Sequence, residues 1–156
     1  LPVAVLTNSS LMFRADVRQQ LVHADVVVAK LDAPNDGLFH RVNRPAFGLH
    51  FDQLAEGIKR FRDEYKGKLA LQMMFVEANR DSASEMAVVV HGISPDEVQI
   101  NTPLRPCGVK PLPPGDIATI QREFSELENV VTVYEAPKHE IVPFDLAETL
   151  RRRPKL

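Results

Sequence analysis

The chain has 156 residues, of which 44% are hydrophobic and 26% are charged, and its formal net charge is −2 at pH 7. This composition is typical of a globular domain with one sizeable core, and the slight negative charge gives no general electrostatic attraction to nucleic acid. The single cysteine, Cys107, excludes a disulfide within the chain and a metal cage built from thiolates.

The sequence also lacks the usual signals for a membrane or a secretory pathway. No apolar run approaches the roughly 20 residues that a membrane-spanning helix needs, and no signal peptide is visible. Together with the single cysteine, this favours a reducing, cytoplasmic setting. The chain opens with LPVAVLT, which does not begin with Met and reads as a strand, so we expect a piece of a longer protein.

The first part of the chain alternates predicted strands and helices. Residues 1–7 favour a short strand, and residues 14–23 carry apolar side chains at helical spacing. Residues 25–31, DVVVAKL, form a continuous apolar run, which is typical of a strand covered on both faces in a parallel sheet. Residues 32–50 contain two prolines and two glycines and are predicted to be a loop.

The clearest predicted helix follows this loop. Apolar residues from Phe51 to Tyr65 recur at helical spacing, and Gly67 is expected to end the helix in the usual C-terminal position. Residues 69–76 are the next apolar strand. The sequence SASE at residues 82–85 fits a capping box and is expected to open a further helix.

The last predicted elements are a strand at residues 98–101, a helix from about residue 116 and a strand at residues 130–134. Repetition of strand and helix indicates parallel βαβ units in an α/β fold. Two architectures fit this order, an open doubly wound sheet and part of a (β/α) barrel. No glycine-rich phosphate loop follows any strand, which disfavours the usual nucleotide-binding sheets.

Three predicted strands end in polar sequences, namely LTNSS, KLDA and QINTP. Polar groups are costly inside a buried strand, so they gather where the chain emerges into a loop. Because the carboxyl ends of parallel strands meet at one edge of the sheet, we expect the three sequences to border a common site.

Four stretches of the chain resemble the radical S-adenosylmethionine (SAM) superfamily: VAVLTNSSLMFRADVRQQL, DVVVAKLDAPNDGLFHRVNRP, FDQLAEGIKRFRDEYKGKLALQMMFVEANRDS and PDEVQINTPLRP. They look most like the Fe–S oxidoreductase-type proteins related to the molybdenum-cofactor and wyosine-base enzymes, and they cover most of residues 3–106. The resemblance implies a partial (β/α) barrel. In such enzymes a [4Fe-4S] cluster, held by a CxxxCxxC motif, cleaves SAM to a 5′-deoxyadenosyl radical that abstracts hydrogen from the substrate.

This chain contains no such cysteine motif. The resemblance therefore implies that the chain begins near the third barrel strand, and that an upstream segment of the same protein carries the cluster loop and completes the barrel. Residues 1–135 are expected to be the C-terminal part of the barrel, and residues 136–156 a linker and the start of a C-terminal helical domain. The chain alone is expected to bind neither SAM nor the cluster, to be inactive, and to expose a sheet edge.

The resemblance also assigns contacts to the predicted strand ends and loops, but no catalytic residue and no metal ligand. The expected SAM contacts are Thr7, Asn8, Ser9, Asp32, Asn101 and Thr102, and the expected substrate contacts are Asn43, Arg44 and Arg105. A buried lysine needs a partner, so Lys30 is expected to pair with Asp32.

The residues alone leave two other hypotheses open. One is a stand-alone α/β module that binds a small anionic ligand or RNA at the strand ends through Arg41, Arg44 and Arg105. The other is a half-barrel completed by a partner chain. The sequence does not identify the substrate, a small molecule or RNA, and neither DNA nor a membrane is an expected partner.

Overall fold

The computed structural model describes residues 1–105 and 107–135, and five parallel strands form a single sheet in it. The strands are β1 (Ala4–Thr7), β2 (Val26–Lys30), β3 (Lys68–Met74), β4 (Glu97–Asn101) and β5 (Val130–Thr132). Their order in the sheet is the order in the chain, and every neighbouring pair is parallel. A doubly wound sheet reverses its strand order at a switch point, whereas sequential order is that of a (β/α) barrel. The α/β partial-barrel prediction is therefore confirmed.

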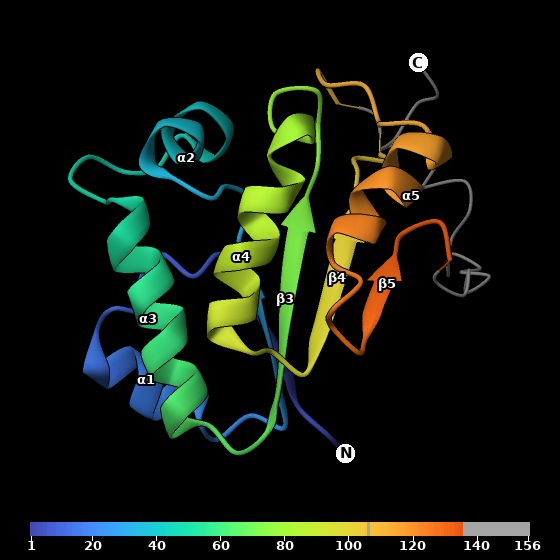
Figure 1. The fold of residues 1–156 in the computed structure, drawn as a ribbon. Helices are drawn as coiled ribbons and strands as arrows, with labels where there is room; N and C mark the ends of the chain where they lie inside the picture. The colour runs from blue at the N-terminus through green and yellow to red at the C-terminus, as the bar shows by residue number, and fades with distance from the viewer. Residues whose placement is uncertain (106, 136–156) are drawn as a thin grey trace, which may run out of the picture.

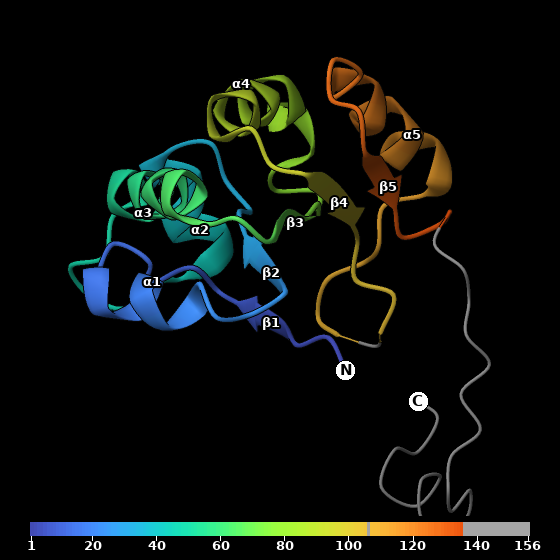
Figure 2. The ribbon, with the colours of Figure 1, turned by 90° about the horizontal axis from the view of Figure 1, so that it is seen from below.

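The helices cover one face of this sheet. They are α1 (Ala15–Leu21), α2 (Asp36–Asn43), α3 (Phe51–Glu64), α4 (Ala83–Ile93) and α5 (Pro114–Glu123), with a short 3₁₀ turn, η1 (Arg80–Ser82), before α4. Figure 1 views the molecule from the helical side, with the strand arrows pointing towards α2. Figure 2 shows the helices as an outer arc, with the loop between β4 and α5 on the other side of the sheet. Sequential parallel strands with crossovers of one hand produce this arrangement.

The hydrophobic core lies between the sheet and the outer helices. Alternate strand residues such as Leu71, Met73 and Ile100 face the helices and are fully buried. They pack in one cluster with Ile58 and Phe61 of α3 and with apolar residues of α4 and α5. Each fully buried side chain of this size contributes about 1.5–3 kcal/mol to folding, so the cluster is the main source of stability for the sheet edge that carries the site.

The opposite, inner face of the sheet is partly polar and partly open. Lys30, Gln72 and Gln99 are register neighbours on β2, β3 and β4, and they form a polar row across this face. Leu6 of the edge strand β1 also belongs to this face, and 71% of its surface is exposed. A polar, open inner face is unlike a packed core, and it is the surface that would line the inside of a completed barrel.

Three local predictions were wrong. Residues 32–50 contain helix α2, because the Asn35 side chain accepts a hydrogen bond from Leu38 N (3.1 Å) and caps it. Gly67 does not end α3, which stops at Glu64; a Cβ at position 67 would instead collide with the Tyr65 ring. SASE does open a helix, α4, as expected, but the predicted capping box is absent: the Ser82 side chain forms no cap hydrogen bond, and the turn η1 leads into the helix. The expected start of a helical domain at 136–156 lies outside the described residues.

Asp96, just before β4, ties the amino ends of two strands together. Its Oδ2 atom accepts a hydrogen bond from Leu69 N (2.7 Å) and lies 2.6 Å from Nη1 of Arg62. Burial raises the pKa of Asp96, but the Leu69 hydrogen bond and the Arg62 guanidinium outweigh it, so the pKa lies below its ordinary value. The ionised carboxylate therefore stabilises the fold above the ordinary pKa of 3.8, and this stabilisation is lost as the pH falls through the lower pKa of the folded state.

Replacing Asp96 with asparagine should lower the free energy of unfolding by about 1 kcal/mol at neutral pH, since the side chain is partly exposed. The difference from wild type should shrink at about pH 3, because the wild-type carboxylate is then becoming protonated. Urea unfolding followed by circular dichroism at both pH values measures this. Asp63→Asn, at an exposed position on α3, is the control and should change stability little at either pH. An equal Asp96→Asn effect at both pH values would contradict the assignment.

Candidate functional site

The carboxyl edge of the sheet is held together by hydrogen bonds between neighbouring strand ends. Ser9 Oγ, after β1, donates to the carbonyl oxygen of Lys30 at 2.8 Å. The buried Asn79 amide donates to the carbonyl oxygens of Asp32 (2.8 Å) and Met74 (3.0 Å), and its Oδ1 accepts from Val76 N (2.8 Å). The ends of β1, β2 and β3 are thus fixed relative to one another.

Asp32 lies at the centre of this edge and is only 5% exposed. Its Oδ1 accepts a hydrogen bond from Met74 N (2.8 Å), and its Oδ2 accepts one from Asn43 Nδ2 (2.7 Å). The ammonium of Lys30 lies 3.3 Å from Oδ2, so the expected Lys30–Asp32 pair is present. A carboxylate with these three partners braces β2, β3 and α2.

An open cleft of about 830 Å³ lies beside this brace. Its lining comes from the ends of β2 and β3, from α2, and from the loops after β3 and β4; its charged members are Lys30, Asp32, Arg41, Arg44 and Glu77. Both carboxylates have cationic partners, because Asp32 pairs with Lys30 and Glu77 lies 3.3 Å from Arg80. Arg41 and Arg44 form no ion pair with another residue of the described ranges, so the cleft wall formed by α2 carries positive charge.

The structure brings some of the predicted contact residues into the cleft and leaves others beside it. Asp32, Asn43 and Arg44 line the cleft, whereas Thr7, Asn8, Ser9, Asn101, Thr102 and Arg105 do not. The six residues outside the cleft follow or end strands at the same edge of the sheet.

Two of these residues support the backbone. Ser9 is fully buried at a positive φ of 66°, and its hydroxyl donates a hydrogen bond to the Lys30 carbonyl oxygen. Thr102 Oγ1 accepts a hydrogen bond from Leu112 N at 2.8 Å. Asn8 remains exposed, and its Oδ1 accepts hydrogen bonds from the Ser10 backbone N (3.1 Å) and hydroxyl (2.7 Å).

Several residues of the site were missed by sequence reasoning. Asn79 gave no clear signal beyond its position after a strand: Val76 and Met74 are local partners, but its contact with Asp32, 47 residues away, is set by the tertiary fold. Gln72 and Gln99 did give a signal, since Gln72 interrupts an otherwise apolar run in β3 and Gln99 belongs to the polar–apolar alternation of β4. Such a residue at an alternate position of a parallel strand indicates that one face of the sheet is not packed.

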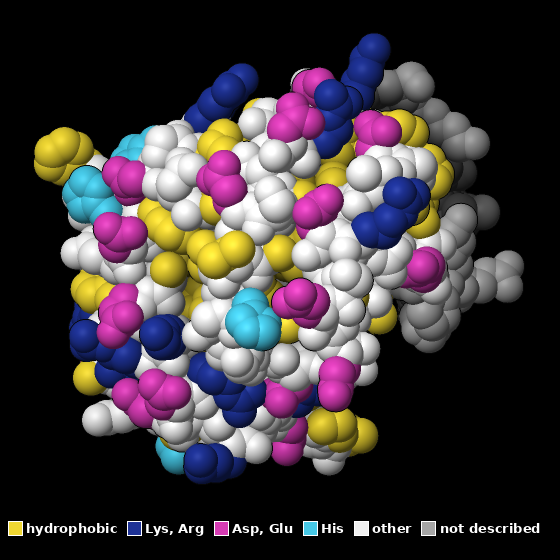
Figure 3. Space-filling model, viewed as in Figure 1, with side chains coloured by type: hydrophobic (Ala, Val, Ile, Leu, Met, Phe, Trp, Pro, Cys, Tyr) yellow, Lys and Arg dark blue, Asp and Glu magenta, His cyan; other side chains and the backbone are white. Residues whose placement is uncertain are grey.

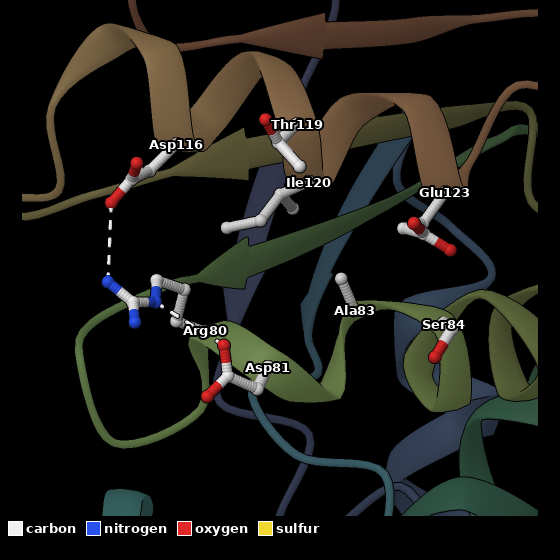
Figure 4. A pocket seen from close by; sticks show the side chains of 8 residues that line it. All are labelled: Arg80, Asp81, Ala83, Ser84, Asp116, Thr119, Ile120 and Glu123. Carbon is white, nitrogen blue, oxygen red and sulfur yellow. Dashed lines mark hydrogen bonds and ion pairs between the residues drawn. The ribbon is translucent and has the colours of Figure 1, made fainter.

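A second hollow of about 250 Å³ lies between α4 and α5 on the helical side. Figure 4 shows Arg80 at its edge, with Asp81 at 3.4 Å and Asp116 at 3.5 Å. The guanidinium is also paired with Glu77, so one cation lies among three carboxylates and the edge of this hollow carries net negative charge. We interpret the Arg80–Asp116 ion pair at the edge of this hollow as a structural link between η1 and α5.

The outer helical surface offers no large field of one sign. Figure 3 shows Lys and Arg side chains interspersed with Asp and Glu side chains over this face, with hydrophobic side chains between them. Among the described residues, no group of three or more His, Cys, Asp or Glu side chains could hold a metal ion. No helix in the described ranges is both long enough and apolar enough to cross a membrane.

This chain is similar to known proteins in sequence and, at a lower level of identity, in fold. No family model matches the sequence. A UPF0026 protein of Methanocaldococcus jannaschii is 31% identical over 134 residues, which cover 84% of this chain and 42% of that protein. A UPF0026 protein of Synechocystis sp. is 37% identical over 109 residues, covering 69% of this chain and 40% of that protein. The chain thus spans less than half the length of these curated relatives, whose names state no activity.

Among solved structures, a radical SAM methyltransferase from Sphaerobacter thermophilus superposes on 83% of this chain and 39% of its own length, with a TM-score of 0.62. The sequence identity is 17%, so the likeness concerns the fold. The chain therefore has the fold found in part of a radical SAM enzyme.

Proposed function

We propose that this chain is part of a radical SAM enzyme, and that the carboxyl edge of its sheet borders bound SAM in the full-length protein. The observation that carries the proposal is the sequential parallel sheet, whose carboxyl edge and inner face are polar. In folds of this kind ligands bind at the carboxyl ends of the strands. The fold of the Sphaerobacter thermophilus enzyme supports the superfamily assignment.

The described residues do not fit an iron–sulfur cluster. Such a cluster is held by several cysteine thiolates, and this chain has one cysteine, the exposed Cys107. In our proposal the cluster ligands come from another segment of the full-length protein. We derive no step of the reaction from residues of this chain acting on the cluster.

The same residues do fit a polar, nucleoside-like cofactor. Asn101 ends β4 on the inner face, and its side-chain amide forms no hydrogen bond within the described ranges. An amide both donates and accepts, so Asn101 suits a ligand that carries hydroxyls and ring nitrogens. When bound, SAM would supply the group that abstracts hydrogen, while Asn101 and the strand ends around it would orient the cofactor.

The cleft beside Asp32 is our proposed place for the substrate. Arg41 and Arg44 line it, and a guanidinium can bind a carboxylate or phosphate through two parallel hydrogen bonds. We propose that they hold an anionic group of the substrate, while Asp32 fixes the side chain of Asn43, which lines the same cleft. Arg105, in the loop after β4, is a further candidate contact.

The test uses the full-length protein, reconstituted anaerobically with iron and sulfide. It should develop a broad absorbance near about 400 nm and bind SAM in calorimetry. Asn101→Ala should raise the dissociation constant of SAM about tenfold, which corresponds to one lost hydrogen bond of roughly 1.4 kcal/mol.

The matched control is Asn129→Ala, at the opposite, amino edge of the sheet, where the side chain donates to Asp96 O at 3.0 Å. This variant should keep the wild-type affinity for SAM once its folding has been checked by thermal unfolding. A full-length protein that acquires no cluster, or that does not bind SAM, would overturn the proposed function.

A further inference from the structure

A chain of directed hydrogen bonds crosses the inner face of the sheet, outside the cleft and the core. Gln72 Nε2 on β3 donates to Gln99 Oε1 on β4 at 3.0 Å. Gln99 Nε2 donates to Glu97 Oε1 at 2.7 Å, and Lys68 Nζ donates to Glu97 Oε2 at 2.6 Å. We call these four residues, Lys68, Glu97, Gln99 and Gln72, the inner-face relay.

The carboxylate of Glu97 sets the direction of every bond in the relay. An ionised carboxylate only accepts hydrogen bonds, so Gln99 must turn its N–H group towards Glu97 and its carbonyl oxygen towards Gln72. Gln72 must then donate to that carbonyl. Burial raises the pKa of Glu97, but the hydrogen bonds from Lys68 and Gln99 more than offset this and lower it, which favours the ionised form.

The carbonyl oxygen of Gln72 is left over at the end of the relay. Within the described ranges this oxygen forms no hydrogen bond. Every buried side-chain nitrogen or oxygen in those ranges has a partner, so an oxygen without one is not buried. Gln72 Oε1 is therefore an accessible acceptor on the inner face. Its register neighbour on β2 is Lys30, whose ammonium is partly exposed.

We infer that Glu97 is a positioning residue that makes Gln72 a hydrogen-bond acceptor for a neutral, amide-type N–H group of a ligand inside the barrel. Lys30, the register neighbour of Gln72, carries an ammonium that disfavours a cationic donor and can itself bind the carbonyl oxygen of an amide. An acceptor beside a cation thus complements the paired N–H and C=O groups of an amide edge. The inference deepens the proposed function and rests on it for the presence of a ligand on this face.

The variant Glu97→Gln should reverse the whole relay. Lys68 would still donate to the side-chain oxygen at position 97, so the new amide would turn its N–H group towards Gln99. Gln99 would then donate to Gln72 Oε1, and Gln72 would present its N–H group to the ligand instead of its oxygen. The acceptor becomes a donor while the shape of the face is kept.

Two small probes read out this reversal on the 156-residue chain by NMR titration. Acetamide carries N–H and C=O groups, whereas N,N-dimethylacetamide carries only the C=O group. The wild-type chain should bind acetamide about fivefold more tightly at Gln72, as expected for one additional hydrogen bond. In Glu97→Gln this ratio should fall to about one, because both probes can accept from Gln72. Glu56→Gln, on the exposed side of α3, should keep the wild-type ratio.

A second measurement does not depend on binding. Nitrogen–carbon coupling across the hydrogen bond should connect the Gln72 side-chain nitrogen to the Gln99 carbonyl in the wild type, and the reverse pair in Glu97→Gln. If Glu97→Gln does not fold, Gln72→Met tests the same acceptor and should abolish the acetamide preference.

A wild-type ratio near one would overturn the inference, and so would an unchanged ratio in either relay variant. Cluster reconstitution of the full-length protein tests the proposed function separately. A failure of the inference about Gln72 can therefore be distinguished from a failure of the proposed function.

Discussion

Replacing Gly57 with alanine should destabilise the protein by more than about 2 kcal/mol, because the new methyl group would overlap a neighbouring backbone. Gly57 lies in the middle of α3, where a Cβ atom would be 2.5 Å from Phe13 N and 2.6 Å from the Met12 carbonyl carbon. A flexible side chain could move aside, but the backbone after β1 cannot. The Arg18 guanidinium holds it through hydrogen bonds to the carbonyl oxygens of Met12 and Phe13, both at 3.0 Å.

The matched control is the same substitution at Gly92 in α4, where an added Cβ atom would have nothing within 4 Å of it. There alanine should stabilise by about 0.5–1 kcal/mol, because it restricts the unfolded chain and favours the helix. Urea unfolding followed by circular dichroism measures both variants. If Gly57→Ala were as stable as the wild type, α3 could not approach the β1–α1 loop as closely as these distances require.

Most of the sheet could be predicted from the sequence, because its strands are buried on the helical side and carry long apolar runs. The predicted strands at residues 25–31 and 69–76 contain or overlap almost all of β2 and β3. Helix α2 was missed, because it is short and depends on the Asn35 cap and on tertiary contacts. One such contact is the 2.8 Å hydrogen bond from Phe51 N to Asp36.

Only part of the site could be predicted in the same way. The Lys30–Asp32 pair follows from the sequence, since residues two apart at a strand end lie on the same side. The other partners of Asp32 lie 11 and 42 residues away in the chain, at Asn43 and Met74. No periodicity or motif connects positions so far apart, so only the parallel register and the docking of α2 identify them.

Asn79 should be the most sensitive polar position at the carboxyl edge. Its amide donates to the carbonyl oxygens of Asp32 and Met74, and its Oδ1 accepts from Val76 N. Replacing Asn79 with alanine leaves these backbone groups without a partner in a site that is 1% exposed, so we expect a loss of about 2–4 kcal/mol. The ends of β2 and β3 would then no longer be fixed beside the cleft.

The substitution Asn79→Asp separates the role of the donor from that of packing, because it keeps the size of the side chain. The carboxylate would face two carbonyl oxygens that now lie 2.8 and 3.0 Å from the amide nitrogen. At neutral pH it should therefore destabilise at least as much as alanine, by about 3 kcal/mol or more. Asn8→Asp is the control, since the Asn8 side-chain oxygen accepts both hydrogen bonds from Ser10, and a carboxylate can accept them equally well.

Thermal and urea unfolding of the three variants measure these differences, and amide hydrogen exchange locates them. Protection should fall first at Met74 N and Val76 N, which donate to Asp32 and Asn79, while the amides in the middle of α3 keep wild-type protection. If Asn79→Asp were no less stable than Asn8→Asp, the amide of Asn79 would not hold the two strand ends, and the cleft wall would need another support.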